Sequence, residues 1–210
     1  MKYGIVNKKK IWPKADLFII KADISNSELE EKDYYLCERD LRNIKYDLVP
    51  FSGISVKRRD SKQYQILKMG VSTFGKLFSN TELGAGASIY CKNKDHLYKN
   101  DYVLKGWNSN WKKFDSFFSS LVNQNIRLDS NIETFQKIKK ISNKMIQLQI
   151  MKNRELSDFL FKGIGNFEEP FTATYLFENS ILKTNYEIPF SITTGSGRSK
   201  GVFTLVLKPA

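Results

Sequence analysis

The sequence predicts an α+β fold in which antiparallel sheets flank a helical middle segment. Two patterns support this prediction. Short aromatic and β-branched stretches occur before residue 70 and again after residue 170, separated by Asn, Gly and Pro. Between residues 109 and 150, apolar residues recur at steps of three and four, the spacing of amphipathic helices. We expect residues 1–210 to form a single compact domain, divisible into subdomains 1–105 and 106–210, and a ferredoxin-like (RRM-related) module is one arrangement that fits.

The first predicted elements are a strand and a helix. Residues 17–20 (Leu-Phe-Ile-Ile) form a short apolar run that is typical of a buried strand. Ser27 and Glu30 have the spacing of a capping box, which marks the first turn of a helix. We therefore expect a helix that continues to about Tyr46.

A hairpin and two short elements are expected next. Alternating stretches at residues 54–56 and 64–66 predict a β-hairpin. Residues 70–80 then favour a short helix or turn, and residues 88–91 favour a strand that follows a glycine-alanine run.

The middle of the chain favours two long helices. Apolar residues that begin at Trp111 predict an amphipathic helix over residues 109–125, in which Trp111 faces the core. Ser130 and Glu133 form a second capping-box pattern, which starts another helix. Residues 146–150 alternate apolar residues with Gln, so they fit a strand as well as a helix.

The last part of the chain has the composition of an antiparallel sheet. Strands are expected at residues 171–177 and 186–192, and a final strand at residues 202–207 follows a glycine-rich loop.

The chain is strongly basic. It carries 34 Lys and Arg against 22 Asp and Glu, a formal net charge of +12. An excess of this size repels itself unless a polyanion screens it, so nucleic acid is the expected partner. A lysine-rich composition also follows from an AT-rich genome, which explains the number of lysines better than their clustering.

The cysteines and the apolar runs exclude several classes of protein. Cys37 and Cys91 are far apart and neither belongs to a Cys-x-x-Cys pair, so we expect no disulfide framework and no zinc site. The sequence has no signal-peptide pattern and no run of about 18 apolar residues. We therefore expect a cytoplasmic protein that has no membrane partner, no metal and no cofactor.

The glycine-rich loop, residues 195–201 (Gly-Ser-Gly-Arg-Ser-Lys-Gly), has the composition of a phosphate-binding segment. Glycines let the backbone approach an anion closely, while an arginine can make a forked contact and a lysine a point-charge contact. The spacing differs from that of a nucleotide-binding P-loop, and a strand is expected after it. A basic hairpin turn without a ligand has the same pattern. The predicted contacts are Gly195, Gly197, Arg198, Lys200 and Gly201.

Together with residues 205–209 (Leu-Val-Leu-Lys-Pro), this loop resembles the C-terminal glycine-rich loop and last strand of the RAMP superfamily of CRISPR-associated proteins, in particular its repeat-processing endoribonucleases. The resemblance implies RRM-related modules that grip guide RNA. It also implies that some members cut RNA without a metal, using a histidine or a tyrosine-lysine set to activate a 2′-hydroxyl. No histidine lies near the N-terminal strand and helix, so a relative that binds RNA without cutting it fits equally well.

Two other basic segments are candidate nucleic-acid contacts. The tip of the predicted hairpin gathers cations that would contact phosphates in a salt-dependent way. The segment 105–113 interleaves tryptophan with lysine, a mixture that lets bases stack while cations hold the backbone. Trp107 falls outside the helical stripe that starts at Trp111, so it is the stacking candidate. The predicted contacts in these two segments are Lys57, Arg58, Arg59, Lys62, Trp107, Lys112 and Lys113.

His96 is the single histidine of the chain. A metal-free ribonuclease needs a general base for the 2′-hydroxyl and a general acid for the leaving oxygen, and His96 with Tyr98 or Lys99 could supply both. If the protein is an enzyme, we therefore expect a metal-independent endoribonuclease.

These observations favour a protein that grips single-stranded or hairpin RNA, as a CRISPR-type RNA-binding or RNA-processing subunit of antiviral defence that works with other subunits of a ribonucleoprotein complex. Two alternatives remain open. One is a metal-dependent DNA endonuclease of a restriction or phage system. The other is a phage or virulence protein whose basic face binds an acidic protein partner.

Overall fold

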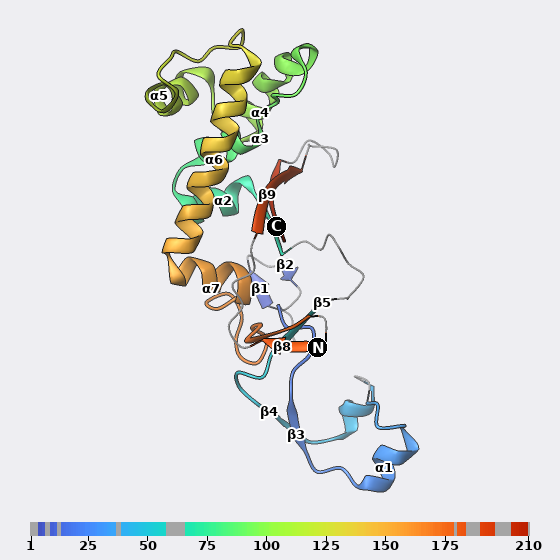
Figure 1. The fold of residues 1–210 in the computed structure, drawn as a ribbon. Coiled ribbons are helices and arrows are strands. Elements are labelled where there is room, and N and C mark those ends of the chain that lie inside the picture. Colours follow the sequence, from blue (N-terminus) through green and yellow to red (C-terminus); the bar gives the residue numbers. More distant parts are fainter. Residues whose placement is uncertain are drawn as a thin grey trace. The chain divides into compact units, whose positions relative to one another are not determined.

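The computed structural model describes residues 4–6, 9–11, 14–36, 39–57, 66–178, 180–183, 190–195 and 203–209 (Figure 1). The fold is α+β, as predicted. The chain divides into two compact units, and each is assembled from two separate stretches. Unit 1 comprises Met1–Lys62 and Asp158–Glu187, and unit 2 comprises Gln63–Ser157 and Ile188–Ala210. A division at residue 105 would cut through helix α4 (Asn100–Gly106) of unit 2.

Unit 1 is built from short strands. Two antiparallel pairs, β1 with β2 and β3 with β4, accompany a mixed sheet in which β7 pairs in parallel with β5 and antiparallel with β8. The boundary between the units at residues 157 and 158 lies inside α7. The elements are β1 (Gly4–Val6), β2 (Lys9–Ile11), β3 (Ile20–Ala22), α1 (Asn26–Glu31), η1 (Asp40–Asn43), β4 (Tyr46–Leu48), β5 (Ile54–Lys57), α7 (Arg154–Lys162), β7 (Tyr175–Glu178) and β8 (Ile181–Lys183).

The predictions for the first strand and helix are partly wrong. Within the run expected to form a buried strand, Ile20 alone belongs to β3, and Leu17 and Ile19 are more than half exposed. Helix α1 ends at Glu31, because Asp33 and Tyr34 adopt positive φ angles that a helix cannot continue through. Its capping box uses Ser25 and Glu28, two residues before the predicted pair.

The predicted hairpin of residues 54–56 with 64–66 lies partly outside the described residues, which stop at Lys57 and resume at Ile66. Strand β5 pairs with β7, whereas the Ile66 amide donates to the Leu207 carbonyl at the start of a different sheet. The two stretches therefore belong to different units. Alternating apolar residues predict that each stretch is extended, but the partner is chosen by segments more than 100 residues away.

Unit 2 combines one antiparallel sheet with a group of helices. The sheet has the strand order β6-β10-β9. The pairing of β9 with β10 confirms that the last predicted strand follows the glycine-rich loop in an antiparallel hairpin. The elements are β6 (Leu67–Gly70), α2 (Val71–Phe78), α3 (Thr81–Ser88), η2 (Lys94–Lys99), α4, α5 (Trp111–Val122), α6 (Ile132–Lys152), β9 (Phe190–Gly195) and β10 (Thr204–Pro209).

Helix α3 is the centre of the unit 2 core. A Cβ added at Gly84 would lie 2.2 Å from the Trp107 ring, and one at Gly86 would lie 2.1 Å from Ser142 Oγ. The glycines therefore let Trp107 and helix α6 approach the α3 backbone closely. Since the helix continues to Ser88, the strand predicted at residues 88–91 does not form.

The two long predicted helices are confirmed. Helix α5 buries Phe114 and Phe118 and holds Trp111 half-buried, so Trp111 faces the core as expected. Helix α6 continues through residues 146–150, which settles that ambiguous stretch as helix, and it buries Ile146 and Ile150. Its N-cap is Asn131, because that side chain accepts the Thr134 amide.

Two further features concern the whole chain. Each sheet formed by the described residues has two or three strands, whereas an RRM-related module has four. Within the parts of the chain that the structure describes, no helix is both long enough and apolar enough to cross a membrane.

Candidate nucleic-acid interface

The candidate site lies on unit 2, where the segment after α3 meets η2 and α4. Asn100, the first residue of α4, is fully buried. The Tyr90 amide donates to Asn100 Oδ1 at 2.8 Å, and Asn100 Nδ2 donates to the Tyr90 carbonyl at 3.2 Å. One side-chain amide thus satisfies both backbone groups of Tyr90 and fixes this residue without a strand partner.

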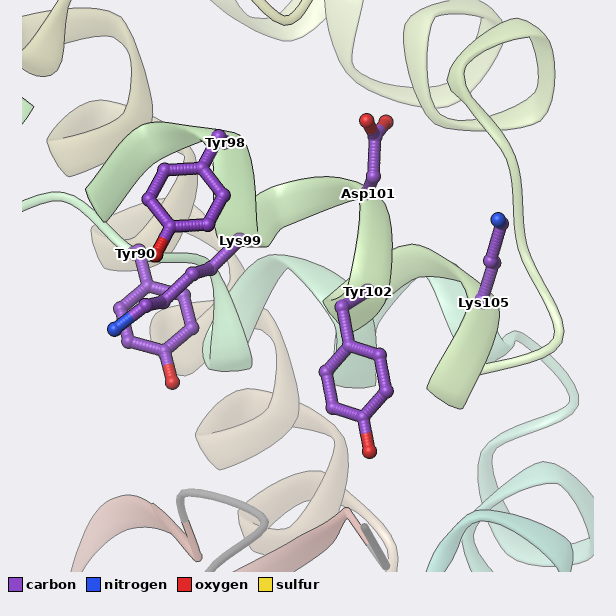
Figure 2. Close-up of a pocket in the computed structure, with 6 residues that line it drawn as sticks. All are labelled: Tyr90, Tyr98, Lys99, Asp101, Tyr102 and Lys105. Carbon is purple, nitrogen blue, oxygen red and sulfur yellow. The ribbon is translucent and has the colours of Figure 1, made fainter. Parts of the chain in front are cut away.

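Tyr90 forms one side of an aromatic and cationic cluster. The Lys99 Nζ lies 5.7 Å from the centre of the Tyr90 ring and 5.8 Å from the centre of the Tyr98 ring. Figure 2 shows the Lys99 side chain crossing these two rings, and Tyr102 on the neighbouring turn of α4. Both Tyr98 and Tyr102 are more than half exposed. Their rings are therefore accessible for stacking.

These residues line an open cavity of about 470 Å³, which we call the tyrosine-lysine groove; it is lined by Tyr90, Tyr98, Lys99, Asp101, Tyr102 and Lys105. The Asp101 carboxylate accepts a hydrogen bond from Trp111 Nε1. This bond directs Asp101, the one acid among the described residues that line the groove, toward the tryptophan of helix α5. Lys105 is exposed, so the lysines set the charge that a ligand meets.

A second cavity, of about 340 Å³, shares Tyr90 with the groove; this inner pocket is lined by residues 88–93, His96, Lys139, Thr194 and Phe203. Lys139 enters it from the middle of α6, and its Nζ donates to the Ile89 carbonyl at 3.4 Å. Burial lowers the pKa of the Lys139 ammonium from its usual value. No aspartate or glutamate is among the described residues that line the pocket.

The residues that flank the glycine-rich loop line this pocket. Thr194, next to the end of β9, and Phe203, just before β10, both line it. The Phe203 ring lies 5.3 Å from the Tyr102 ring, and a Cβ at Gly106 would lie 2.0 Å from Phe203 Cδ2. Gly106 therefore makes room for Phe203, which directly precedes β10. Gly195 closes β9, while Gly197, Arg198, Lys200 and Gly201 lie outside the described residues.

The three candidate catalytic residues do not line one cavity. Tyr98 and Lys99 line the tyrosine-lysine groove, whereas His96 is exposed on η2 and lines the inner pocket. The His96 and Tyr90 ring centres are 6.4 Å apart, and Tyr90 lines both cavities.

The prediction that Trp107 stacks on bases is wrong. Its side chain is fully buried, and its indole Nε1 donates to Ser88 Oγ at 2.8 Å. Trp107 directly follows helix α4 and is buried like Val103 and Leu104 of that helix, so its place relative to helix α5 does not decide whether it is exposed. Lys112 and Lys113 are exposed on the first turn of α5. Lys57 ends β5 in unit 1, and Arg58, Arg59 and Lys62 lie outside the described residues.

Sequence reasoning missed Tyr90, Tyr102, Lys105 and Lys139. The spacing of Tyr98, Tyr102 and Lys105 on a helical surface could have revealed three of the groove residues. No local signal points to Lys139, because it lies 40 residues beyond Lys99 in the sequence.

The comparisons with known proteins add no relative: no family model, no curated protein and no solved structure matches this chain. Among the residues that the structure describes, no three His, Cys, Asp or Glu side chains gather where they could hold a metal ion.

Proposed function

We propose that unit 2 binds single-stranded RNA, with bases stacked on the tyrosines of the groove and phosphates held by its lysines. The observation that carries this proposal is the position of Lys99 across the rings of Tyr90 and Tyr98 in an open groove. Proteins that bind single strands combine aromatic platforms with cations that follow the backbone. Binding, and not cleavage, is the proposed activity.

The division of charge between the units supports this proposal. Unit 2 carries 18 Lys and Arg against 7 Asp and Glu, a net charge of +11, whereas unit 1 carries 16 against 15. Almost the whole excess charge of the protein therefore belongs to the unit that contains the groove. A concentrated positive field attracts a polyanion and holds it in a salt-dependent way.

The glycine-rich loop supports RNA as the strand. Thr194 and Phe203, the described residues on either side of this loop, line the inner pocket, which shares Tyr90 with the groove. The resemblance of this loop to the RAMP superfamily points to RNA, and to a role within a ribonucleoprotein complex.

The test is a comparison of affinities by fluorescence anisotropy. Single-stranded RNA, hairpin RNA, single-stranded DNA and duplex DNA of matched length are titrated at several salt concentrations, with and without magnesium. We expect the tightest binding for single-stranded RNA and an affinity that falls as salt rises. The variant Tyr98→Ala should bind about 10-fold more weakly, since each stacked base contributes about 1–3 kcal/mol.

Tyr35→Ala is the matched control, because Tyr35 is a tyrosine of unit 1 that is 75% exposed. Equal affinities of the Tyr98 and Tyr35 variants would contradict the assignment of the groove. Preference for duplex DNA, with cleavage that magnesium supports, would favour the DNA endonuclease. Absence of binding to every nucleic acid would favour the acidic protein partner.

A further inference from the structure

We infer that the inner pocket binds the terminal phosphate of the strand that occupies the tyrosine-lysine groove. This inference rests on the proposed function and names the substrate class more narrowly: a single-stranded RNA that ends in a phosphomonoester.

The charges of the pocket suit a phosphate. Lys139 approaches from α6, Lys92 from the segment after α3, and His96 from η2. Among the described residues, no carboxylate forms an ion pair with Lys139, and its hydrogen bond to the Ile89 carbonyl is long at 3.4 Å. The described part of the chain therefore gives this half-buried ammonium no carboxylate partner. A phosphate would supply a negative charge together with strong acceptor oxygens.

Neutral donors complete the pocket. The side-chain oxygen of Asn93 accepts the Asp95 amide at 3.0 Å, so its NH2 group is the end that can donate to a ligand. Thr194 adds a hydroxyl from the end of β9. Cations and neutral donors from four separate segments thus converge on one cavity.

The connection to the groove selects a terminal phosphate. An internal phosphodiester carries nucleotides on both sides, whereas a terminal phosphate continues into the chain on one side only. The inner pocket is lined by residues of the segment 88–93, η2 and α6 together with Thr194 and Phe203, and it shares Tyr90 with the groove. A strand stacked on the groove tyrosines can therefore end at the pocket. A monoester also carries up to about two negative charges, against one for a diester, which suits several cations.

The test compares three RNAs of one sequence, one with a 5′-phosphate, one with a 3′-phosphate and one with hydroxyl groups at both ends. We expect one of the two phosphorylated RNAs to bind the wild-type protein about 10-fold more tightly than the hydroxyl RNA. The identity of that RNA reports which end enters the pocket.

The variant Lys139→Met should lose this preference, because it keeps the apolar stem of the side chain and removes the charge. Lys140→Met is the matched control, since Lys140 is the next residue of α6, is exposed and does not line the pocket. It should keep the full preference. His96→Ala should also reduce the preference.

Equal, salt-dependent binding of all three RNAs to the wild-type protein would overturn this inference and leave the proposed function in place. Failure to bind any of them would overturn both. Equal loss of preference in the Lys139 and Lys140 variants would show that general charge, and not the pocket, recognises the phosphate. The wild-type comparison decides the inference even if Lys139→Met does not fold, which circular dichroism would reveal.

Discussion

Lys99 lies across two tyrosine rings at distances where a cation interacts favourably with an aromatic face. Because the same ammonium is half-exposed at an open groove, it can hold a phosphate while the rings hold bases. One side chain therefore links the two kinds of contact that the proposed function requires. Asn100 supports this arrangement by fixing the Tyr90 backbone through two hydrogen bonds.

We predict that Lys99→Met weakens RNA binding by about 2–30-fold, the range that corresponds to loss of a cation–π or phosphate contact. Lys99→Arg should retain most of the affinity, because a guanidinium also stacks on aromatic rings and contacts phosphate. Anisotropy titrations of both variants check this prediction. Equal losses for Met and Arg would mean that the shape of the lysine side chain, and not its charge, is required.

Lys14 in unit 1 provides a prediction about stability and pH. Burial, with a smaller contribution from nearby Lys57, lowers the pKa of Lys14 from 10.5 to about 8. Between pH 8 and 10.5, the unfolded chain therefore binds more protons at this site than the folded chain, and the free energy of unfolding rises with pH.

The variant Lys14→Met lacks this titration. Its free energy of unfolding should exceed that of the wild type by on the order of 1–3 kcal/mol near pH 7. This difference should shrink as pH rises to about 10.5. Urea denaturation of both proteins across this range measures the difference. A difference that stays constant with pH would contradict the burial of a charged Lys14.

Among the secondary-structure elements, helix α3 shows how small side chains allow a helix to form where local propensity favours a turn. Its glycine-alanine run suggests a turn that leads into a strand, yet the segment is a helix packed against α6. Gly84 and Gly86 have low helix propensity, but they are the residues that let Trp107 and Phe118 reach the helix backbone. Close packing outweighs the propensity of each glycine.

Two glycine substitutions should change stability in opposite directions. A Cβ at Gly86 would lie 2.1 Å from Ser142 Oγ and 2.6 Å from Phe118 Cζ, both in the core. Gly86→Ala should therefore destabilise the protein by about 1–3 kcal/mol through overpacking. At Gly75 in α2 the nearest atom, Thr81 Cγ2, is 3.4 Å away, so Gly75→Ala should stabilise by about 0.5–1 kcal/mol.

Thermal denaturation of the two variants beside the wild type measures both effects. Stabilisation by Gly86→Ala would show that α3 does not pack closely against α6.

For the whole molecule, the uneven charge of the two units is the feature with the clearest consequence. The net charge of +11 in unit 2 and +1 in unit 1 means that binding of a polyanion should depend on the lysines of one unit. The division is not visible along the sequence, because each unit uses two separate stretches of chain.

We predict that replacing Lys105 and Lys112 of unit 2 by Ala reduces the salt slope of RNA binding by about 1–2, since each phosphate contact on a single strand contributes about 0.7. Replacing Lys21 and Lys45 of unit 1, which are also exposed, should leave the slope unchanged. Affinities measured over a tenfold range of salt test this prediction. Equal changes in both double variants would mean that total charge, and not unit 2, governs binding.

Local patterns in the sequence determined the long helices and the total charge. The helices that start at Trp111 and Ile132 follow from apolar residues at steps of three and four, because the two partners of each helical hydrogen bond are only four residues apart in the sequence. Tertiary structure alone decided which strands pair, which tryptophan is buried and how charge divides between the units. It also brought Lys139 beside Tyr90 and Thr194, since strand partners and cavity walls come from distant segments whose meeting depends on the packing of the whole chain.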